Sequence, residues 1–178
     1  KSLFGNHKSE EFPILVKLID AAKNLSIQVH PDDTYAKKHE NSFGKSECWY
    51  ILDAEEDTDI IIGHKASTYD EFKTYVNENR FEELVNNYPV HKGDTFNIEP
   101  GTIHAIKAGT LLLEIQQSSD VTYRFYDYDR LSNGAKRPLH LKEALDVVKI
   151  PDNTIARGLD THYFKTDKLT EPTTISKY

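Results

Sequence analysis

The sequence has little of what disulfide-linked, membrane-spanning or nucleic-acid-binding proteins need. Its 178 residues include one cysteine, Cys48, which excludes an internal disulfide and indicates a reducing, cytoplasmic location. No apolar run approaches the ~20 residues that a membrane-spanning helix requires. Lysine and arginine number 22 against 29 aspartates and glutamates, so the net charge is −7. Because no basic stripe offsets this charge, we expect neither a nucleic-acid partner nor a membrane partner.

The sequence also contains no methionine, and its first residue is Lys1. We therefore expect a fragment or a processed product of a longer chain. The lack of methionine is either chance or a sign that methionines have dropped out of the sequence, and both explanations stay open. Hydrophobic residues at 38% and charged residues at 29% are typical of a globular domain that buries its own core.

Short segments of apolar or alternating character, separated by turn residues, predict a fold dominated by β-strands. Strands are expected at residues 12–20, 25–30, 47–52, 58–63, 94–98, 102–106, 111–117 and 121–129. The first of these is a nearly continuous apolar run and is therefore expected to be buried. Neither a βαβ alternation nor a glycine-rich phosphate loop is present, which favours an antiparallel β-sandwich or barrel.

Helical spacing interrupts this pattern. Phe72, Val76, Leu84 and Val85 recur at helical intervals behind a serine–threonine pair that can cap them, so one or two short helices are expected within 68–87. The remaining expectations are a short helix near 138–148, a loop at 34–44, and a weakly structured end at 151–178 with one strand near 162–165.

Four polar side chains are expected to meet inside the predicted barrel. Gln28 and His30 share a face because they lie two residues apart on one strand. Glu47 begins the next strand, and His104 follows the turn after another strand. Two imidazoles, a carboxylate and an amide oxygen suit a divalent metal, with zinc the best match and manganese, iron or cobalt as substitutes. A site without cysteine ligands suits catalysis better than structure.

Four stretches of the sequence resemble, in the same order, the blocks of a known family. They read LSIQVHPDD, GKSECWYIL, PVHKGDTFNIEPGTIHAI and LEIQQSSDVTYRFYDYDR. The glycine–aspartate and proline–glycine pairs before His104 are similar to the second cupin motif, and Gln28-x-His30 with a later glutamate is similar to the first. Together the stretches resemble the type I mannose-6-phosphate isomerases (phosphomannose isomerases), in their short bacterial form. The resemblance runs from about residue 12 to about residue 150.

The resemblance implies a zinc-dependent enzyme on a cupin jelly roll, which interconverts mannose 6-phosphate and fructose 6-phosphate. It places the metal ligands on Gln28, His30, Glu47 and His104, and the catalytic arginine and lysine on Arg124 and Lys45. It also implies that residues 1–150 are the catalytic core with its helical insertion. Residues 151–178 would then be a linker, or the start of a second cupin-like domain. The expected partner is a small substrate, a hexose 6-phosphate.

Isomerisation between an aldose and a ketose passes through an enediolate, whose negative charge needs a nearby cation. Lys45 is expected on the same face as Glu47, and Arg124 on a strand whose alternate residues are apolar. Both are therefore placed to bind the phosphate or to stabilise the enediolate. The structural alternative for Arg124 is an ion pair with Asp120 or Asp127.

The base that moves the proton is less specified by the sequence. A carboxylate, a lysine or a water on the metal could serve. Glu114 and Asp120 are the carboxylates near the expected strands, and both are also candidates for binding the substrate. Glu114 could instead accept a hydrogen bond from a ligand histidine.

Two other functions are compatible with a metal-binding cupin. One is a protein that binds a sugar phosphate without turnover, and the other is a different metal enzyme, such as an iron oxygenase. The joint presence of the four ligand candidates, Lys45 and Arg124 favours the isomerase.

Overall fold

Most of the regular structure consists of β-strands. The computed structural model describes residues 12–153 and 155–171. The strands are β1 Ile14–Asp20, β2 Ile27–Val29, β3 Glu47–Ala54, β4 Asp59–His64, β5 Val85–Pro89, β6 Thr95–Ile98, β7 His104–Ala105, β8 Thr110–Gln117, β9 Tyr123–Tyr126, β10 Leu131–Ser132 and β11 Ala135–Lys136. The helices are α1 Asp33–His39, α2 Tyr69–Asn77, α3 Phe81–Leu84 and α4 Leu141–Val147.

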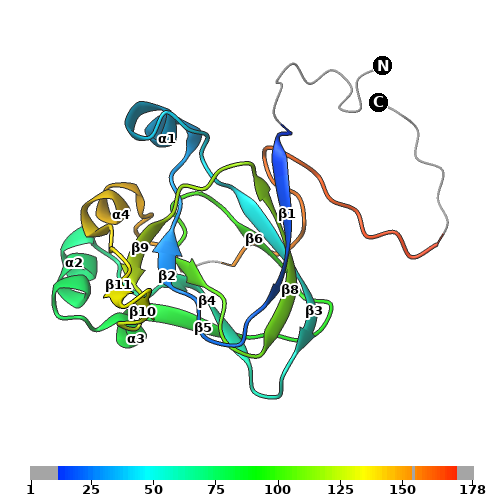
Figure 1. Cartoon of the computed structure of the whole chain (residues 1–178), viewed down its shortest axis with the longest axis horizontal. Coiled ribbons are helices and arrows are strands. Elements are labelled where there is room, and N and C mark those ends of the chain that lie inside the picture. The colour runs from blue at the N-terminus through cyan, green and yellow to red at the C-terminus, as the bar shows by residue number, and fades with distance from the viewer. Residues whose placement is uncertain (1–11, 154, 172–178) are drawn as a thin grey trace.

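Two antiparallel sheets face each other and enclose the interior of a jelly roll. One sheet has the order β1-β8-β3-β6, and the other has the order β5-β4-β7-β2-β9. Figure 1 looks between the sheets, with α2, α3 and α4 outside the second sheet. The strand-dominated antiparallel fold, the helical insertion and the late short helix are all confirmed.

The register of β2 decides which side chains enter the interior. Gln28 lies opposite His104 of β7 on one side and opposite Arg124 of β9 on the other. Residues directly opposite each other in antiparallel strands project from the same face. Ile27 and Val29 project from the opposite face and are buried there, as the alternation predicted.

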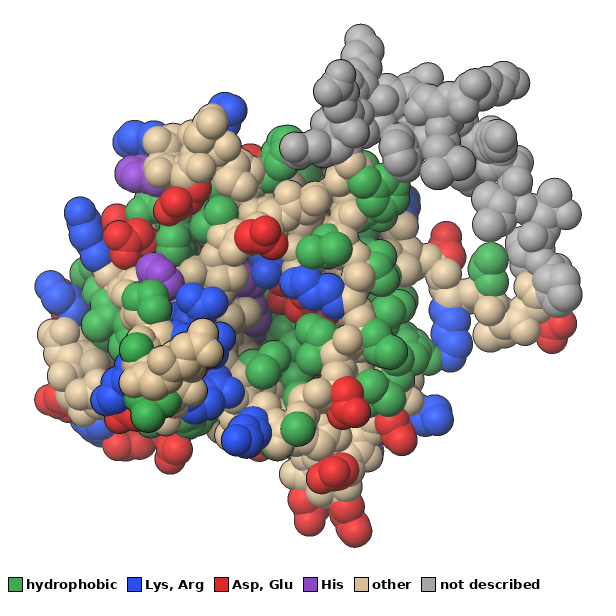
Figure 2. Space-filling view, in the orientation of Figure 1, with side chains coloured by type: hydrophobic (Ala, Val, Ile, Leu, Met, Phe, Trp, Pro, Cys, Tyr) green, Lys and Arg blue, Asp and Glu red, His purple; other side chains and the backbone are tan. Residues whose placement is uncertain are grey.

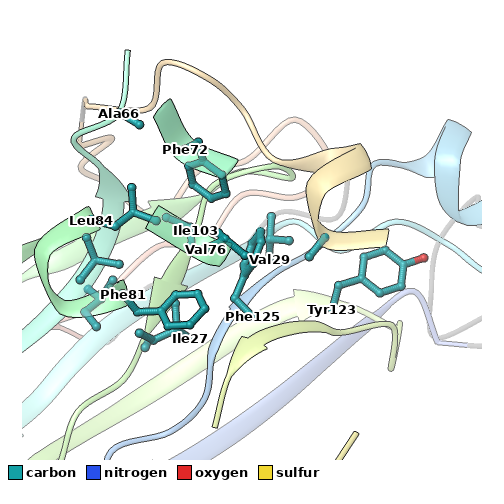
Figure 3. Packing of buried hydrophobic residues seen from close by; sticks show 14 residues of the cluster. Ile27, Val29, Ala66, Phe72, Val76, Phe81, Leu84, Ile103, Tyr123 and Phe125 are labelled. Atoms are coloured by element: carbon teal, nitrogen blue, oxygen red, sulfur yellow. The ribbon is translucent and has the colours of Figure 1, made fainter. Parts of the chain in front are cut away.

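Each sheet face that carries apolar residues has its own core. Between the sheets, Trp49, Phe96 and Leu112 belong to one buried cluster. On the outer face of the second sheet, Phe72 of α2 and Phe125 of β9 belong to another, which Figure 3 shows from close by. The helices therefore cover the apolar face of β2 and leave its polar face free for the barrel interior.

The structure corrects two expectations in the first forty residues. Strand β1 is not buried on both faces, because Val16 and Leu18 are 52% and 68% exposed on its outer side. The segment expected to be a loop contains helix α1. Asp32 caps this helix by accepting a hydrogen bond from the backbone N–H of Tyr35. Ala36 is its one buried residue, so the helix has almost no apolar stripe to reveal it in the sequence.

Two expectations in later segments are also wrong. Val85 does not extend the helical region but begins β5, which pairs with β4 along the edge of the second sheet. The strand expected near 162–165 does not form. Instead, Ala156 makes an isolated bridge to Asn97, and the Arg157 guanidinium lies 4.5 Å from the centre of the Phe96 ring. Residues 1–11, 154 and 172–178 of the two expected domains lie outside the described residues.

Within the described part of the chain, each helix is too short or too polar to cross a lipid bilayer.

Gly63 of β4 lies against the segment that follows α4, so a substitution at Gly63 tests how tightly the two are packed. Gly63 has a φ of +72°, and a Cβ there would lie 2.3 Å from the backbone oxygen of Asp152. We expect Gly63→Ala to lower the free energy of unfolding by about 3 kcal/mol, through the left-handed backbone and the collision together. Equilibrium unfolding in urea measures this loss.

Gly134 provides the matched control. Its φ is +82°, yet a Cβ there would meet nothing within 4 Å. Gly134→Ala should therefore cost about 1 kcal/mol, for the backbone alone. Equal losses in the two variants would show that the close approach of residue 152 does not constrain the fold.

Candidate functional site

Three buried side chains converge inside the barrel from three parts of the chain. They are His30, directly after β2, Glu47 at the start of β3, and His104 at the start of β7. One ligand atom from each lies within 4.8 Å of the other two. The Nε2 atoms of His30 and His104 lie 3.5 and 3.4 Å from the Glu47 carboxylate oxygens. The structure thus brings together three of the four predicted ligands as a possible metal site.

Backbone carbonyls orient both imidazoles. The Nδ1 atom of His30 lies 3.0 Å from the carbonyl oxygen of Val121, and that of His104 lies 2.9 Å from the carbonyl oxygen of Thr102. A carbonyl can only accept, so Nδ1 carries the proton in each ring and donates it there. The unprotonated Nε2 of each ring then faces Glu47. Metal-binding histidines adopt this tautomer, in which one ring nitrogen donates to a protein acceptor and the other is left for the metal.

The atoms that face one another lack the partners that buried polar groups normally have. His30 Nε2 and Glu47 Oε2 are buried without a hydrogen-bond partner among the described residues. The other carboxylate oxygen of Glu47 accepts a bond of 3.1 Å from the indole N–H of Trp49. Unsatisfied buried polar atoms are costly, and a cation between them would remove that cost. The donor set therefore fits a divalent metal.

The protonation states agree with this assignment. Burial, assisted by the nearby Lys45 charge, lowers the pKa of His30 to about 3. Burial likewise lowers the pKa of His104. Burial alone would raise the pKa of Glu47, but the surrounding His30, His104 and Lys45 outweigh it and lower that pKa. Two neutral imidazoles and one carboxylate are the forms in which these residues bind metals.

The fourth predicted ligand, Gln28, lies beside this cluster. Its Nε2 is 3.3 Å from His104 Nε2, while its Oε1 accepts a bond of 3.0 Å from the Ser26 hydroxyl. The amide group has its nitrogen toward the cluster, and a half-turn about its last bond would exchange nitrogen for oxygen. Gln28 therefore projects from the same face of the sheet as His104 and lies close enough to contact the cluster.

Cations line the wall next to the cluster. Lys45, only 5% exposed, has its Nζ 3.8 Å from a Glu47 carboxylate oxygen. Glu114 is also buried and accepts a bond of 2.7 Å from Lys17 of β1. Burial, then the charge of Glu47, raises the pKa of Glu114. Buried charges are rare unless they are paired, so Lys45 and Glu114 belong to the barrel interior rather than to a solvated surface.

Lys17 was missed in the sequence. It is a lone cation inside an apolar run, and the outward direction of Val16 and Leu18 on β1 sends Lys17 into the barrel. It contacts both Glu114 and Gln116 of β8. The sequence carries no signal for it, because a lysine that alternates with the apolar Val16 and Leu18 would be predicted to face solvent.

Arg124 and Asp120 have different surroundings. The Arg124 Nε is buried and has no hydrogen-bond partner in the part of the chain that the structure describes, and Asp127 pairs with Arg130 and Arg137. Neither structural alternative, an ion pair of Arg124 with Asp120 or with Asp127, forms among the described residues. Asp120 is exposed and lines a surface cavity of about 490 Å³ beside His140, without contacting the His–Glu–His cluster.

Figure 2 shows how these charges reach the surface. Histidine, acidic and basic side chains lie together in a hollow at the centre of this face, between the two sheets. More lysine and arginine side chains lie next to it, over the β10–β11 hairpin. The arrangement can hold a cation at its base and bind an anionic ligand at its rim.

Comparisons with known proteins agree with this chemistry. A family model, described as the catalytic domain of type I phosphomannose isomerase, matches residues 1–86. The chain is 51% identical to a probable mannose-6-phosphate isomerase, GmuF, and 48% identical to the mannose-6-phosphate isomerase ManA, both from Bacillus subtilis. These alignments cover 84% and 85% of this chain but 48% and 49% of the relatives. The chain therefore spans about half the length of the curated relatives it matches.

A solved structure is similar throughout the fold. The mannose 6-phosphate isomerase from Bacillus subtilis superposes with a TM-score of 0.85 at 40% sequence identity. The match covers 90% of this chain and 56% of that one.

A ligand variant tests the metal site. We expect the protein to bind one divalent ion per chain, and His104→Ala to weaken zinc binding by about 100-fold or more, since it removes a nitrogen ligand. Competition with a chromophoric chelator measures the affinity. His91→Ala is the control, because the His91 side chain is 83% exposed and outside the cluster. Equal zinc affinity of the His104→Ala variant and the unaltered protein would contradict the site.

Proposed function

This chain belongs to the type I phosphomannose isomerase family, and we propose that it interconverts mannose 6-phosphate and fructose 6-phosphate in the barrel interior. The observation that carries the proposal is the convergence of His30, Glu47 and His104 beside the buried Lys45. Metal ligands next to a buried cation match the needs of a reaction that builds negative charge on a sugar oxygen.

We assign the metal as zinc. Two imidazole nitrogens and a carboxylate oxygen form a common set for catalytic zinc, which keeps a coordination position open for substrate. Gln28 is the proposed fourth ligand, and a half-turn of its amide group would bring the oxygen toward the cluster. A bound divalent ion supplies Lewis acidity, polarising the oxygens of the sugar and orienting them.

The cations of the site do the remaining electrostatic work. Lys45 lies two residues before the start of β3, and its Nζ is near the Glu47 carboxylate. It can donate a hydrogen bond to a sugar oxygen as negative charge develops on that oxygen. Arg124 extends from β9 into the same interior, and its guanidinium can bind an oxyanion with two parallel hydrogen bonds. Because its Nε has no acceptor within residues 12–153 and 155–171, this arginine can donate to a ligand.

Proton transfer between C1 and C2 requires a group that first takes a proton and then returns it. Glu114 and Lys17 are the paired groups of the inner wall, joined at 2.7 Å. The pair can hold one additional proton on Glu114, whose pKa burial already raises. The proton leaves C2 of mannose 6-phosphate and arrives at C1 of fructose 6-phosphate, while the hydroxyl on C2 loses a proton and the oxygen on C1 gains one, so the reaction is balanced without a further reagent.

Metal removal gives the first test of the activity. We expect dialysis against a chelator to abolish equilibration of the two hexose 6-phosphates, and added zinc to restore it. A coupled assay for fructose 6-phosphate measures both steps. Iron-dependent oxygen uptake without isomerisation would instead identify an oxygenase, and substrate binding without turnover in the zinc-loaded protein would identify a binding protein.

An arginine variant tests the role of Arg124. We expect Arg124→Ala to lower kcat by about 100- to 1000-fold, the usual effect of removing a group that stabilises an oxyanion. The zinc content should stay unchanged, because the side chain is not a proposed ligand. Arg157→Ala is the control, since that arginine pairs with Asp94 and is 53% exposed. Turnover close to normal in Arg124→Ala would remove this arginine from the mechanism.

A further inference from the structure

The loop between β6 and β7 is bonded to both histidines of the metal cluster. This loop, residues 99–103, ends directly before His104, and the Nδ1–H of His104 donates to the carbonyl of Thr102 at 2.9 Å. Gly101 of the same loop donates its N–H to the carbonyl of His30 at 2.9 Å. The position of this loop therefore affects both imidazoles at once.

The segment that follows α4 is hydrogen-bonded to this loop. The N–H of Lys149 donates to the carbonyl of Gly101 at 2.8 Å. The two backbones are in close contact there, since a Cβ on Gly101 would lie 2.9 Å from the carbonyl oxygen of Val147, the last residue of α4. The chain after α4 thus packs directly on the loop that precedes a metal ligand.

The end of β4 is bonded to both of these segments. The N–H of Gly63 donates to the carbonyl of Ile103 at 2.7 Å. The N–H of the next residue, His64, donates to the carbonyl of Asp152, also at 2.7 Å. Each of the three segments is therefore bonded to the other two. They form a closed hydrogen-bonded network, made of residues 63–64, 99–103 and 149–152.

The imidazole of His64 adds a side-chain bond to this network. His64 is fully buried, and its Nε2 lies 2.7 Å from the carbonyl oxygen of Lys149. Because a carbonyl can only accept, Nε2 carries the proton and donates it. On its other side the imidazole packs against Phe72 of α2, with the ring centres 4.6 Å apart. The core under α2 therefore holds the imidazole in the direction of Lys149.

We propose that His64 is a positioning residue for the metal site: it holds the segment 149–152 against the loop 99–103 and thereby fixes how the two ligand imidazoles face each other. Their ring centres lie 4.7 Å apart. Two backbone amides, at positions 149 and 101, connect His64 to His30. Ligands that are held in place before binding lose less conformational freedom when the ion binds. The inference rests on the proposed function for the role of that ion.

The alternative is that His64 contributes only to the packing under α2. Two substitutions separate the two roles. His64→Gln keeps an N–H donor that can reach the Lys149 carbonyl, whereas His64→Leu fills a similar volume without a donor. Should His64→Leu fail to fold, His64→Asn replaces it, because its amide is too short to reach that carbonyl.

Phe81→Leu is the matched control for a loss of packing alone. Phe81 is 2% exposed and belongs to the same apolar cluster as Phe72. Its ring stacks on Tyr126 at 5.1 Å, outside the hydrogen-bonded network. We expect this variant to have a lower melting temperature and the zinc affinity of the unaltered protein.

For His64→Leu we expect zinc affinity to fall about 10-fold, at the lower end of the effect of removing a group that orients a metal ligand. His64→Gln should bind zinc nearly as tightly as the unaltered protein. Competition with a chromophoric chelator measures all of these affinities. Equal zinc affinity in His64→Leu and the unaltered protein would overturn the proposal, whatever the melting temperatures.

Bound cobalt gives a second readout, which a packing role would not change. Co²⁺ accepts the same ligands as zinc, and its visible absorption depends on the geometry of those ligands. We expect altered bands in His64→Leu, and the bands of the unaltered protein in His64→Gln and Phe81→Leu. Identical bands in all four proteins, with a lower melting temperature for His64→Leu, would identify His64 as a core residue only.

Neither measurement needs turnover, so this inference can be separated from the isomerase assignment. Weaker zinc binding in His64→Leu that His64→Gln restores supports the positioning role even if no isomerisation is seen. Isomerisation by the unaltered protein, with zinc affinity and cobalt bands unchanged in His64→Leu, would retain the enzyme and reject the role of His64.

Discussion

The register of β2 between β7 and β9 is the constraint on which the site depends. It places Gln28 opposite both His104 and Arg124, so these three side chains share one face of one sheet, and Glu47 approaches them from the other sheet. A shift of one residue would turn these side chains into the helix-covered core and bring Ile27 and Val29 into the barrel. The apolar residues of β2 pack under α2, α3 and α4, and exposing them would cost free energy. Their burial therefore fixes the register of β2 and, with it, the positions of the site residues.

The interior divides into an apolar part and a charged part, and Trp49 joins the two. Its ring belongs to the core between the sheets, while its indole N–H donates to Glu47. This donor and the charge of Lys45 offset part of the cost of burying Glu47. The core thereby orients the carboxylate, and a cation bound beside it would complete its coordination.

The sequence predicted the parts of the fold and of the site that follow from local pattern. The alternation around Gln28 and His30 gave their face, and the capped periodicity gave the helix at Phe72. Helix α1 and the role of Lys17 were missed for physical reasons. Helix α1 has almost no apolar stripe, and Lys17 gains its meaning from Glu114, which lies 97 residues further along the chain. Contacts of that range have no local signature.

Asp127 extends this argument to the rim of the barrel. In the motif TYRFYDYDR its carboxylate could pair with any of the nearby arginines, and spacing alone does not choose among them. The return of the chain at Arg137 settles the choice, because Arg130 and Arg137 take both carboxylate oxygens. Arg124 is left with a buried Nε that has no acceptor in the described part of the chain. A long-range contact on one carboxylate thus frees a different side chain for the ligand, which is why partner choice, rather than residue type, determines what this motif does.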